Sequence, residues 1–333
     1  MTAPDGQLRG AVLGLGMIGR HHARLLQTVP FARLSGAVDP GGDRFGAVRD
    51  PRLVLEDVDA LLDGEPPDFA VIAVPTEEHL RCARRLAPAG VHLLVEKPLA
   101  STADESRELI EVCEGAGIRA AVGHVERYNP ALIGLRERME EVGTPFLIAT
   151  ERVGPFPDRV RDVGVVKDLA THDLDLVRWL GGAPIATVAA QISHRTGRDH
   201  EDLVLITGRL DSDVAFNSVV DWLTPAKRRT SRVLGDRGML VADTLTADLT
   251  LFRNGAVTSE WSAAQALKGV AEGDSTRFAL ARREPLLVEL EAFCAWVAGD
   301  DGAPIVTLRE GLETVRDAEA VLAAARSGET VRP

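Results

Sequence analysis

Residues 8–22 read LRGAVLGLGMIGRHH, and this stretch decides the fold of the first part of the chain. Six mostly apolar residues, Leu8–Leu13, run directly into the pattern G-x-G-x-x-G at Gly14, Gly16 and Gly19. A strand followed by such a loop and then by a helix is the context in which the pattern predicts dinucleotide binding. The first glycine permits a tight turn, the second lets a pyrophosphate approach the main chain, and the third lets helix and strand pack closely.

The residues around this loop predict which dinucleotide binds. A helix that starts after the loop offers main-chain N–H groups to phosphates, so we expect Met17 and Ile18 to contact the cofactor with the glycines. Asp39 ends the next apolar stretch, about 20 residues on, where a carboxylate accepts ribose hydroxyls and repels a 2′-phosphate. NAD is therefore the expected cofactor. NADP is a weaker expectation, which rests on the nearby Arg44.

The first 124 residues alternate short apolar runs with helical patterns. This alternation indicates βαβ units and a parallel sheet, so we predict a Rossmann dinucleotide-binding domain at residues 1–124. The runs are Leu8–Leu13, Leu34–Val38, Phe69–Val74, Val91–Val95 and Arg119–Val122.

Residues 125–333 follow a different pattern. Helical segments are expected near Pro130–Val142, Lys167–Leu180, Glu284–Ala298 and Leu308–Arg326. Strand-like sequence covers Phe146–Val153 and the stretch from Ile185 to about Glu260. We predict an α+β domain for substrate binding and oligomerisation, with a large, mostly antiparallel open sheet of roughly six strands. An open sheet commonly covers its free face with a second copy, so a homodimer or homotetramer through this sheet is expected. The whole chain is thus of the α/β class.

Bulk properties exclude several functions. The net charge of −12 disfavours nucleic acid as a partner. No apolar run approaches the ~20 residues that a membrane span needs, and the polar N-terminus does not resemble a signal peptide, so a cytoplasmic protein is expected. Cys82, Cys113 and Cys294 lie far apart and are expected to be buried free thiols. No Cys/His group has zinc-ligand spacing, so no metal is expected.

Lys97 is the first candidate catalytic residue. Arginine is the usual cation of this chain, which has only four lysines: Lys97, Lys167, Lys227 and Lys268. Lys97 follows the run Val91–Val95 within Glu96–Lys97–Pro98, at the strand edge where ligands bind in open α/β sheets. An ammonium there can stabilise a developing alkoxide and relay its proton when an alcohol is oxidised. The alternative is an ordinary surface lysine.

A second candidate group lies in Lys167–Leu180. Asp168, His172 and Asp175 are spaced i, i+4 and i+7 and would share one face of a helix. His172 can act as a general base, and Asp168 can orient the imidazole or the substrate. Spacing alone equally allows Asp168 to be a helix cap and His172 a hydrogen-bonded core residue.

These motifs together resemble the glucose–fructose oxidoreductase/inositol dehydrogenase/rhizopine-catabolism (Gfo/Idh/MocA) family. The resemblance rests on Gly14–Gly19, on Ala73–Val74–Pro75–Thr76 with His79, and on Glu96–Lys97–Pro98. It implies that Lys97 is catalytic, that its bond to Pro98 is often cis, and that the Pro75–Thr76 turn lines the cofactor with His79 and Glu96.

The same family has an aspartate, a histidine four residues on and a further aspartate three residues later. Asp168, His172 and Asp175 match this pattern. The resemblance therefore implies that Asp168 and His172 act in catalysis and substrate binding with Lys97, whereas Asp175 is structural. Lys167 and Asp173 are expected to be solvated or one step removed from the substrate.

The substrate class is predicted from the junction near residue 125. Tyr128, the only tyrosine, and Asn129 could bind sugar hydroxyls at the mouth of a cleft, or could simply pack at a hinge. The stretch 123–131 is similar to enzymes of the family that oxidise the 3-hydroxyl of nucleotide-activated amino sugars, such as UDP-N-acetylglucosamine 3-dehydrogenases.

The sequence therefore predicts an NAD(P)-dependent oxidoreductase that moves a hydride between a sugar hydroxyl carbon, C3 of an amino sugar or nucleotide-activated sugar, and nicotinamide. A 3-hydroxyl dehydrogenase of an aminoglycoside or deoxysugar in antibiotic biosynthesis is one alternative. A redox-assisted, NAD-dependent glycosidase and a non-catalytic nucleotide-sugar sensor are two others.

Overall fold

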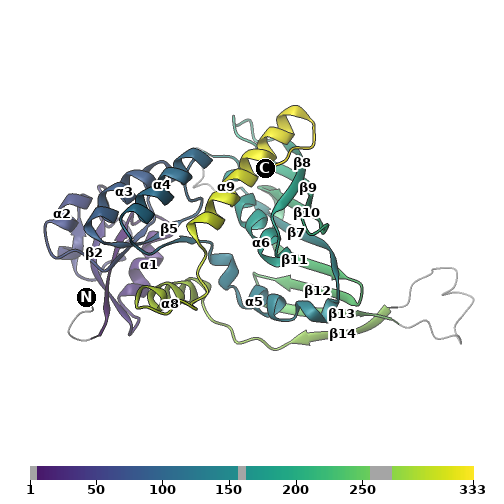
Figure 1. Cartoon of the computed structure of the whole chain (residues 1–333), viewed down its shortest axis with the longest axis horizontal. Coiled ribbons are helices and arrows are strands. Elements are labelled where there is room, and N and C mark those ends of the chain that lie inside the picture. Colours follow the sequence, from purple (N-terminus) through teal and green to yellow (C-terminus); the bar gives the residue numbers. More distant parts are fainter. Residues whose placement is uncertain (1–5, 157–162, 256–271) are drawn as a thin grey trace, which may run out of the picture. The chain divides into compact units, whose positions relative to one another are not determined.

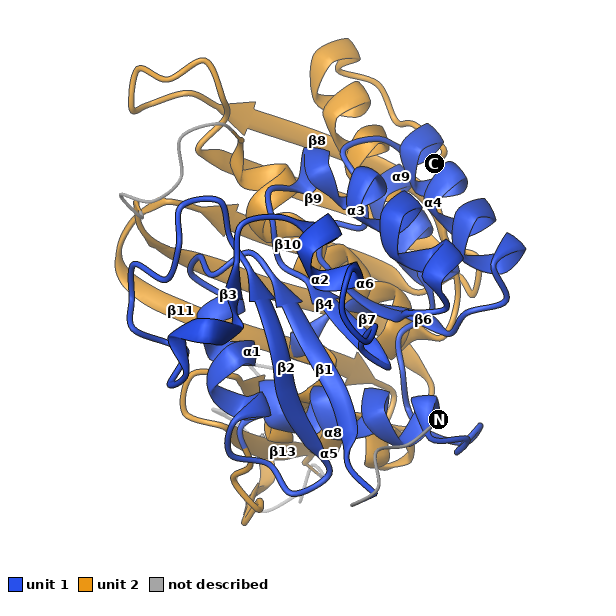
Figure 2. Ribbon diagram, turned by 90° about the vertical axis from the view of Figure 1, so that its left-hand side faces the viewer, with its two compact units in different colours: residues 1–125, 284–316 blue, residues 126–283, 317–333 orange. Residues whose placement is uncertain are grey.

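The structure is a computed structural model that describes residues 6–156, 163–255 and 272–333 (Figure 1). It divides into two compact units, coloured separately in Figure 2. Unit 1 comprises residues 1–125 and 284–316, and unit 2 comprises residues 126–283 and 317–333.

Unit 1 is built on a six-stranded sheet in the order β3-β2-β1-β4-β5-β6, in which every pair is parallel. This is the strand order of the dinucleotide-binding Rossmann fold, so the prediction for this part of the chain is confirmed. The strands are β1 (Leu8–Leu13), β2 (Ala32–Val38), β3 (Val54–Leu55), β4 (Phe69–Ile72), β5 (His92–Glu96) and β6 (Ala120–Gly123).

The helices between these strands begin where the local sequence provides a start. Ahead of α4, the Thr102 hydroxyl caps the helix by accepting a hydrogen bond from the Glu105 N–H at 3.2 Å. The helices of this part are α1 (Gly19–Leu26), α2 (Val58–Leu62), α3 (His79–Leu86) and α4 (Ala103–Gly115).

The domain boundary differs from the one that the sequence predicts. Helix α8 (Pro285–Val297) was expected in the second domain but belongs to unit 1. Its Leu290 and Phe293 are buried in the same core cluster as Phe69 of β4, and the two phenylalanine rings meet edge to face at 5.6 Å. Figures 1 and 2 both show α8 next to α1. The chain thus returns to complete the first core, and an apolar helix carries no local sign of which core it will join.

Unit 2 contains an eight-stranded sheet in the order β14-β13-β12-β11-β7-β10-β9-β8. Only the β7–β10 pair is parallel, so the mostly antiparallel sheet is confirmed, although it has eight strands instead of about six. The strands are β7 (Pro145–Pro155), β8 (Ile185–Ser193), β9 (Leu203–Leu210), β10 (Ala215–Asp221), β11 (Leu223–Gly235), β12 (Gly238–Asp243), β13 (Asp248–Asn254) and β14 (Glu272–Phe278).

One face of this sheet carries the core of unit 2. Ile148 of β7 and Val233 of β11 are buried in one cluster with Leu174 of α6. Outward-facing positions include the exposed Leu205 and Phe252. The helices are α5 (Pro130–Glu137), α6 (Thr171–Gly181) and α9 (Leu308–Ser327), of which α9 runs across the boundary between the units.

Two general expectations can be checked on the described ranges. No helix there is both long and apolar enough to span a bilayer. Cys82, Cys113 and Cys294 are free and buried, as predicted. Burial raises the pKa of Cys82 to about 11 and that of Cys113 to about 12, so neither thiol is poised as a nucleophile at neutral pH.

Candidate active site

The Gly14–Gly19 loop joins β1 to α1, and each glycine has a distinct geometric reason. Gly14 has φ +87°, and a Cβ there would lie 2.6 Å from the carbonyl oxygen of Ala73. A Cβ on Gly19 would overlap the carbonyl oxygen of Gly14. Gly16 has no neighbouring atom within 4 Å of its Cβ position, so its main chain faces open space. Two glycines are therefore required by the fold itself, and the third leaves room for a ligand.

Asp39 stands at the end of β2, beside this loop. Its Oδ2 accepts the Leu15 N–H and its Oδ1 accepts the Gly41 N–H, both at 2.8 Å. Each carboxylate oxygen keeps a further lone pair, so the group can still accept ribose hydroxyls. Asp39 thus holds the glycine loop in place at the edge where a ribose is expected.

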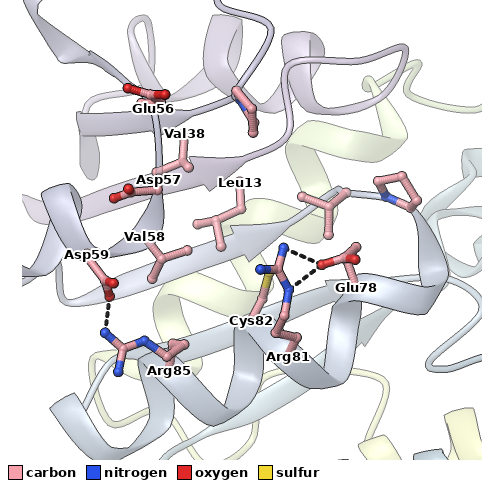
Figure 3. A pocket seen from close by; sticks show the side chains of 13 residues that line it. Leu13, Val38, Glu56, Asp57, Val58, Asp59, Glu78, Arg81, Cys82 and Arg85 are labelled. Atoms are coloured by element: carbon pink, nitrogen blue, oxygen red, sulfur yellow. Dashed lines mark hydrogen bonds and ion pairs between the residues drawn. The ribbon is translucent and has the colours of Figure 1, made fainter.

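A pocket of about 510 Å³ opens at the carboxyl ends of β1, β2 and β4 (Figure 3). Leu13, Val38 and Val74 give it an apolar wall. Its two arginines are engaged by carboxylates, Arg81 by Glu78 and Arg85 by Asp59, as the dashed lines in Figure 3 show. Glu56 and Asp57 add further negative charge. An apolar, acidic pocket suits an uncharged adenosine better than a 2′-phosphate.

Lys97 follows β5 at the same edge of the sheet and is half-buried. The Lys97–Pro98 peptide bond is cis, in line with the family resemblance. The preceding Glu96 is buried, and its Oε1 lies 2.9 Å from Nε2 of His22 on α1. Glu96 therefore faces the interior of unit 1 instead of the cofactor, which differs from its predicted role.

His79 also differs from the sequence-based expectation. Its ring is buried, with Nδ1 3.2 Å from the Leu99 carbonyl and Nε2 3.1 Å from the Val74 carbonyl. Burial lowers the pKa of His79, so the ring is neutral. Both nitrogens face the main chain, and the ring braces the Pro75–Thr76 turn against the segment after Lys97.

Asp168 and His172 lie in unit 2 on a distorted helix start. The sequence predicts a continuous α-helix from Lys167, but Val166–Ala170 forms a π-helical turn and α6 begins only at Thr171. Asp168 therefore sits in the wider turn and His172 in the first turn of α6, and both are half-buried. Such π-helical turns are found frequently at functional sites.

Glu201 holds this turn in place. Its Oε1 accepts the Val166 N–H at 3.0 Å, and its own carbonyl accepts the Val165 N–H at 3.0 Å. A Cβ on Gly164 would overlap the Glu201 carboxylate, so the close approach needs a glycine at that position. The sequence gives no local sign of this support, because Gly164 and Glu201 are far apart along the chain.

A buried ionic cluster lies in the same unit. Arg152 of β7 donates from Nε to Asp173 Oδ2 and from Nη1 to Glu126 Oε1, at 2.7 Å each. Burial disfavours the charge of Glu126, but Arg152, Arg229 and Lys227 outweigh it and hold the pKa of Glu126 below its usual value. Burial raises the pKa of Asp173 in spite of Arg152. We call Arg152, Glu126, Asp173 and Arg229 the Arg152 cluster.

Arg229 of β11 connects this cluster to Asp168. Its Nη1 donates to the carbonyls of Val153 and Arg228, at 2.9 Å each. Burial and the like charge of Arg152 lower the pKa of Arg229, whereas Asp173, Glu126 and Asp168 oppose that shift. No carboxylate of the described residues lies within ion-pair distance of this guanidinium, so it keeps donors for an anionic ligand.

The aspartates after His172 are both structural. Asp175 is buried and pairs with Arg127, at 2.9 Å to Nε and 2.5 Å to Nη2, which agrees with its predicted structural role. Asp173 was expected to be solvated or one step removed from the substrate; it is not solvated but buried in the Arg152 cluster, and a place one step removed from the substrate stays a prediction.

The predicted substrate contacts of Tyr128 and Asn129 are not supported by their positions. Asn129 is the N-cap of α5, where its Oδ1 accepts the Ala131 N–H at 3.0 Å and its Nδ2 donates to the Thr244 carbonyl at 3.1 Å. Tyr128 is only 5% exposed. Their positions suit the packing alternative, and a substrate contact of either residue stays a prediction. The sequence itself indicates this structural role, because asparagine favours the N-cap of a helix and proline, here at position 130, favours the first helical position.

Comparisons with known proteins agree with this arrangement. Residues 8–124 match a family model described as "Oxidoreductase family, NAD-binding Rossmann fold", and residues 139–241 match the "GFO/IDH/MocA C-terminal domain". The UDP-N-acetylglucosamine 3-dehydrogenase of Acidithiobacillus ferrooxidans is 29% identical over 294 residues, which cover 87% of this chain and 89% of that protein. An inositol 2-dehydrogenase of Acidothermus cellulolyticus is 32% identical over 231 residues, covering 65% and 66%.

A solved structure shares the fold over nearly the whole chain. That of the UDP-N-acetylglucosamine 3-dehydrogenase GnnA from A. ferrooxidans has a TM-score of 0.82 at 27% identity, covering 96% of this chain and 98% of that one. Together with the Rossmann loop and Lys97 in unit 1, these matches assign the chain to the Gfo/Idh/MocA family, as an NAD(P)-dependent oxidoreductase that acts on CH–OH groups of sugars.

Proposed function

We propose that the chain is an NAD-dependent dehydrogenase that oxidises the C3 hydroxyl of a nucleotide-activated or amino sugar. The observation that carries this proposal is that one chain combines a complete dinucleotide loop and Lys97 in unit 1 with half-buried Asp168 and His172 beside an arginine-rich cluster in unit 2. Its similarity to a UDP-N-acetylglucosamine 3-dehydrogenase over most of both chains supports the substrate class.

The residues of unit 1 fit a bound NAD. Gly14, Gly16 and Gly19 would hold the pyrophosphate with the main chain of Met17 and Ile18, and Asp39 would accept the ribose hydroxyls. Pro75 and Thr76 would line the cofactor farther along the same sheet edge. The acidic pocket of Figure 3 favours NAD over NADP, since it offers no arginine that lacks a carboxylate partner.

The chemistry divides between the chain and its cofactor. When bound, the nicotinamide supplies the hydride acceptor. His172 takes the proton from the reacting hydroxyl as general base, while the Lys97 ammonium stabilises the charge that develops on that oxygen. Asp168 orients the imidazole or the sugar. In the reverse direction His172 returns the proton.

The Arg152 cluster supports an anionic group on the substrate. Arg229 is half-buried and lacks a carboxylate at ion-pair distance within the described residues. A phosphate of a nucleotide sugar, or the carboxylate of a uronic acid, would complete its hydrogen bonds. A neutral inositol or hexose would offer Arg229 no anionic group to bind.

The test is NADH formation by the purified protein with a panel of sugars. The panel holds UDP-N-acetylglucosamine, the corresponding UDP-linked uronic acid, inositols, free hexoses and an aminoglycoside. Each is assayed with NAD and with NADP. We expect turnover with a nucleotide sugar, and a loss on the order of 10²–10⁴-fold in kcat for Lys97→Ala and for His172→Ala. His194→Ala, an exposed histidine of unit 2, is the matched control.

Other outcomes identify the alternatives. Turnover of the aminoglycoside alone would favour an antibiotic pathway over a nucleotide sugar. Cleavage of a glycoside without net NADH would indicate the redox-assisted glycosidase. Binding of NAD and sugar with neither product would indicate a sensor, and the dehydrogenase proposal would then be wrong.

We also propose that the protein is a homodimer or homotetramer. The exposed Leu205 and Phe252, on the outward face of the unit 2 sheet, support self-association through that face. Light scattering after gel filtration measures the mass directly, and a monomer at all concentrations would exclude it.

A further inference from the structure

Three buried titratable side chains meet inside unit 1, and the dehydrogenase chemistry above uses none of them. They are His22 of α1, Glu96 at the end of β5 and Glu289 of α8. One ring nitrogen or carboxylate oxygen of each lies within 4.8 Å of those of the other two. Figure 1 shows α1 and α8 together in this unit. The three elements are distant in sequence, so the cluster forms only when α8 packs onto the first core.

Glu289 is the unusual member of this cluster. Its side chain is 1% exposed, and neither carboxylate oxygen has a hydrogen-bond partner among the described residues. Among the described residues, the charged group that acts on it is the carboxylate of Glu96, which has the same sign. Burial and Glu96 together raise the pKa of Glu289 well above its usual value. Burying an unpaired carboxylate in such surroundings costs far more free energy than burying the neutral acid, which still needs a hydrogen-bond partner.

The neutral acid has a clear acceptor close by. Glu96 Oε1 lies 2.9 Å from His22 Nε2, so it accepts a hydrogen bond when that nitrogen carries the proton, and a carboxylate has lone pairs for further donors. The Glu289 and Glu96 carboxyl oxygens lie within 4.8 Å of each other, a separation that one bridging water can span. A metal ion is a poorer occupant, because a structural zinc site takes four protein ligands and the described residues supply three.

We propose that Glu289 is a positioning residue for Lys97: as a neutral carboxylic acid it donates its proton toward the Glu96 carboxylate, whose other donor is the Nε2–H of His22. The three side chains hold the end of β5, and Lys97 is the next residue of the chain. The helix α8 thereby takes part in placing the lysine that the proposed function uses. The role of Lys97 rests on that proposed function, but its placement by Glu289 can be tested without any substrate.

The first test examines the protonation of Glu289 by infrared spectroscopy. A buried carboxylic acid absorbs above the amide I band, and this absorption shifts in heavy water. We expect such a band in the wild-type protein at neutral pH and its loss in Glu289→Gln. Glu291→Gln, on the same helix, is the control and should keep the band. Absence of the band from the wild type would overturn the proposal.

The second test reads the surroundings of Lys97 directly. Reductive ¹³C-methylation labels the four lysines, and Lys97→Arg assigns one resonance to Lys97. We expect Glu289→Leu to displace the Lys97 resonance while those of Lys167 and Lys227 stay in place. Glu289→Gln, which can still donate to Glu96, should keep the wild-type position of the resonance. This rescue distinguishes positioning from simple loss of packing.

Three results would contradict the inference, and none depends on finding the substrate. One is an unmoved Lys97 resonance in folded Glu289→Leu. Another is an equal displacement in Glu289→Gln and Glu289→Leu. The third is one equivalent of metal in the purified protein that is lost in Glu289→Gln, which would make the cluster a metal site. If Glu289→Leu does not fold, the infrared band and the Glu289→Gln resonance still decide. Failure of the dehydrogenase assay with a positive result here would refute only the proposed reaction.

Discussion

The loop at Gly14–Gly19 in unit 1 and the turn at Val166–Ala170 in unit 2 are specified in opposite ways. The first depends on main-chain space, because Gly14 and Gly19 stand where any Cβ would strike a carbonyl group. The second depends on side chains from distant positions in the sequence, since Glu201 binds the turn itself and Arg152 binds Asp173 of the helix α6 that follows it. A site shaped by the main chain leaves a compact motif, whereas a site shaped by buried ion pairs does not.

The largest effect is expected from breaking the Arg152 cluster. Arg152→Met removes the only guanidinium that both the half-buried Glu126 and the buried Asp173 pair with directly among the described residues. We expect a loss of about 3–5 kcal/mol in the free energy of unfolding, measured by urea denaturation. Arg228→Met is the control, because Arg228 is exposed on the neighbouring strand β11 and should change stability by less than about 1 kcal/mol. Equal losses of stability in Arg152→Met and Arg228→Met would show that the buried ion pairs of Arg152 do not stabilise unit 2.

The pH dependence of stability sharpens this prediction. In the wild type, the lowered pKa of Glu126 contributes stability that is present above the ordinary glutamate value and is lost as pH falls through the lowered one. In Arg152→Met burial dominates, so the neutral forms of both acids are favoured in the folded state. Stability should then fall as pH rises from about 4 to 7. Parallel pH profiles for the two proteins would show that the cluster does not hold these charges.

Main-chain space is tested next, by adding one methyl group. Gly19→Ala forces the loop and α1 apart, and we expect a loss of about 1–3 kcal/mol in stability together with loss of NAD binding in calorimetry. Gly16→Ala is the matched control, because its Cβ meets nothing within 4 Å. It should keep the melting temperature and weaken NAD alone. A destabilised Gly16→Ala would mean that the open space serves the fold and not a ligand.

A smaller effect is expected from a charge at the same loop. Asp39→Asn keeps an oxygen for the Leu15 N–H but removes the charge that repels a 2′-phosphate. The ratio of kcat/KM for NADP to that for NAD should rise about tenfold. Adding Arg44→Gln should reverse part of this gain. An unchanged ratio would mean that the pocket of Figure 3, and not Asp39, sets the preference.

The smallest effect separates a structural residue from a substrate contact. Asn129→Ala removes the N-cap of α5 and should cost about 1 kcal/mol in stability. The KM for the sugar should stay at its wild-type value, because the Asn129 amide is engaged by the main chain of unit 2. A large rise in KM without a change in stability would restore the predicted substrate contact.

The fold was predictable where local patterns were sufficient. Short apolar runs and the glycine loop predict the parallel sheet of unit 1, and turn residues predict the antiparallel sheet of unit 2. The place of α8 was not predictable, because Leu286, Leu290 and Phe293 would suit either core. Hydrophobic periodicity tells which face of a helix is buried, but not what it is buried against.

The site divides along the same line. The loop glycines, Asp39, Lys97, Asp168 and His172 stand in local motifs and could be named in advance. Arg152, Arg229 and Glu201 could not, because arginine is common in this chain and because the partners of Arg152 and Glu201 lie 21 or more residues away. His79 and Glu96 were named correctly as members of motifs, but their side chains turn inward, and a motif does not state the direction of a side chain.

The return of α8 to unit 1 also has a consequence for biosynthesis. The ribosome completes the strands of the first sheet by residue 123 but does not reach the end of α8 until residue 297. At about 5–20 residues per second, this gap lasts roughly 10–30 s. During this time Phe69 lacks its contact with Phe293, and Glu96 lacks its neighbour Glu289. The nascent first unit is therefore an unfinished surface that chaperones can recognise, and it becomes competent to place its lysine only near the end of translation.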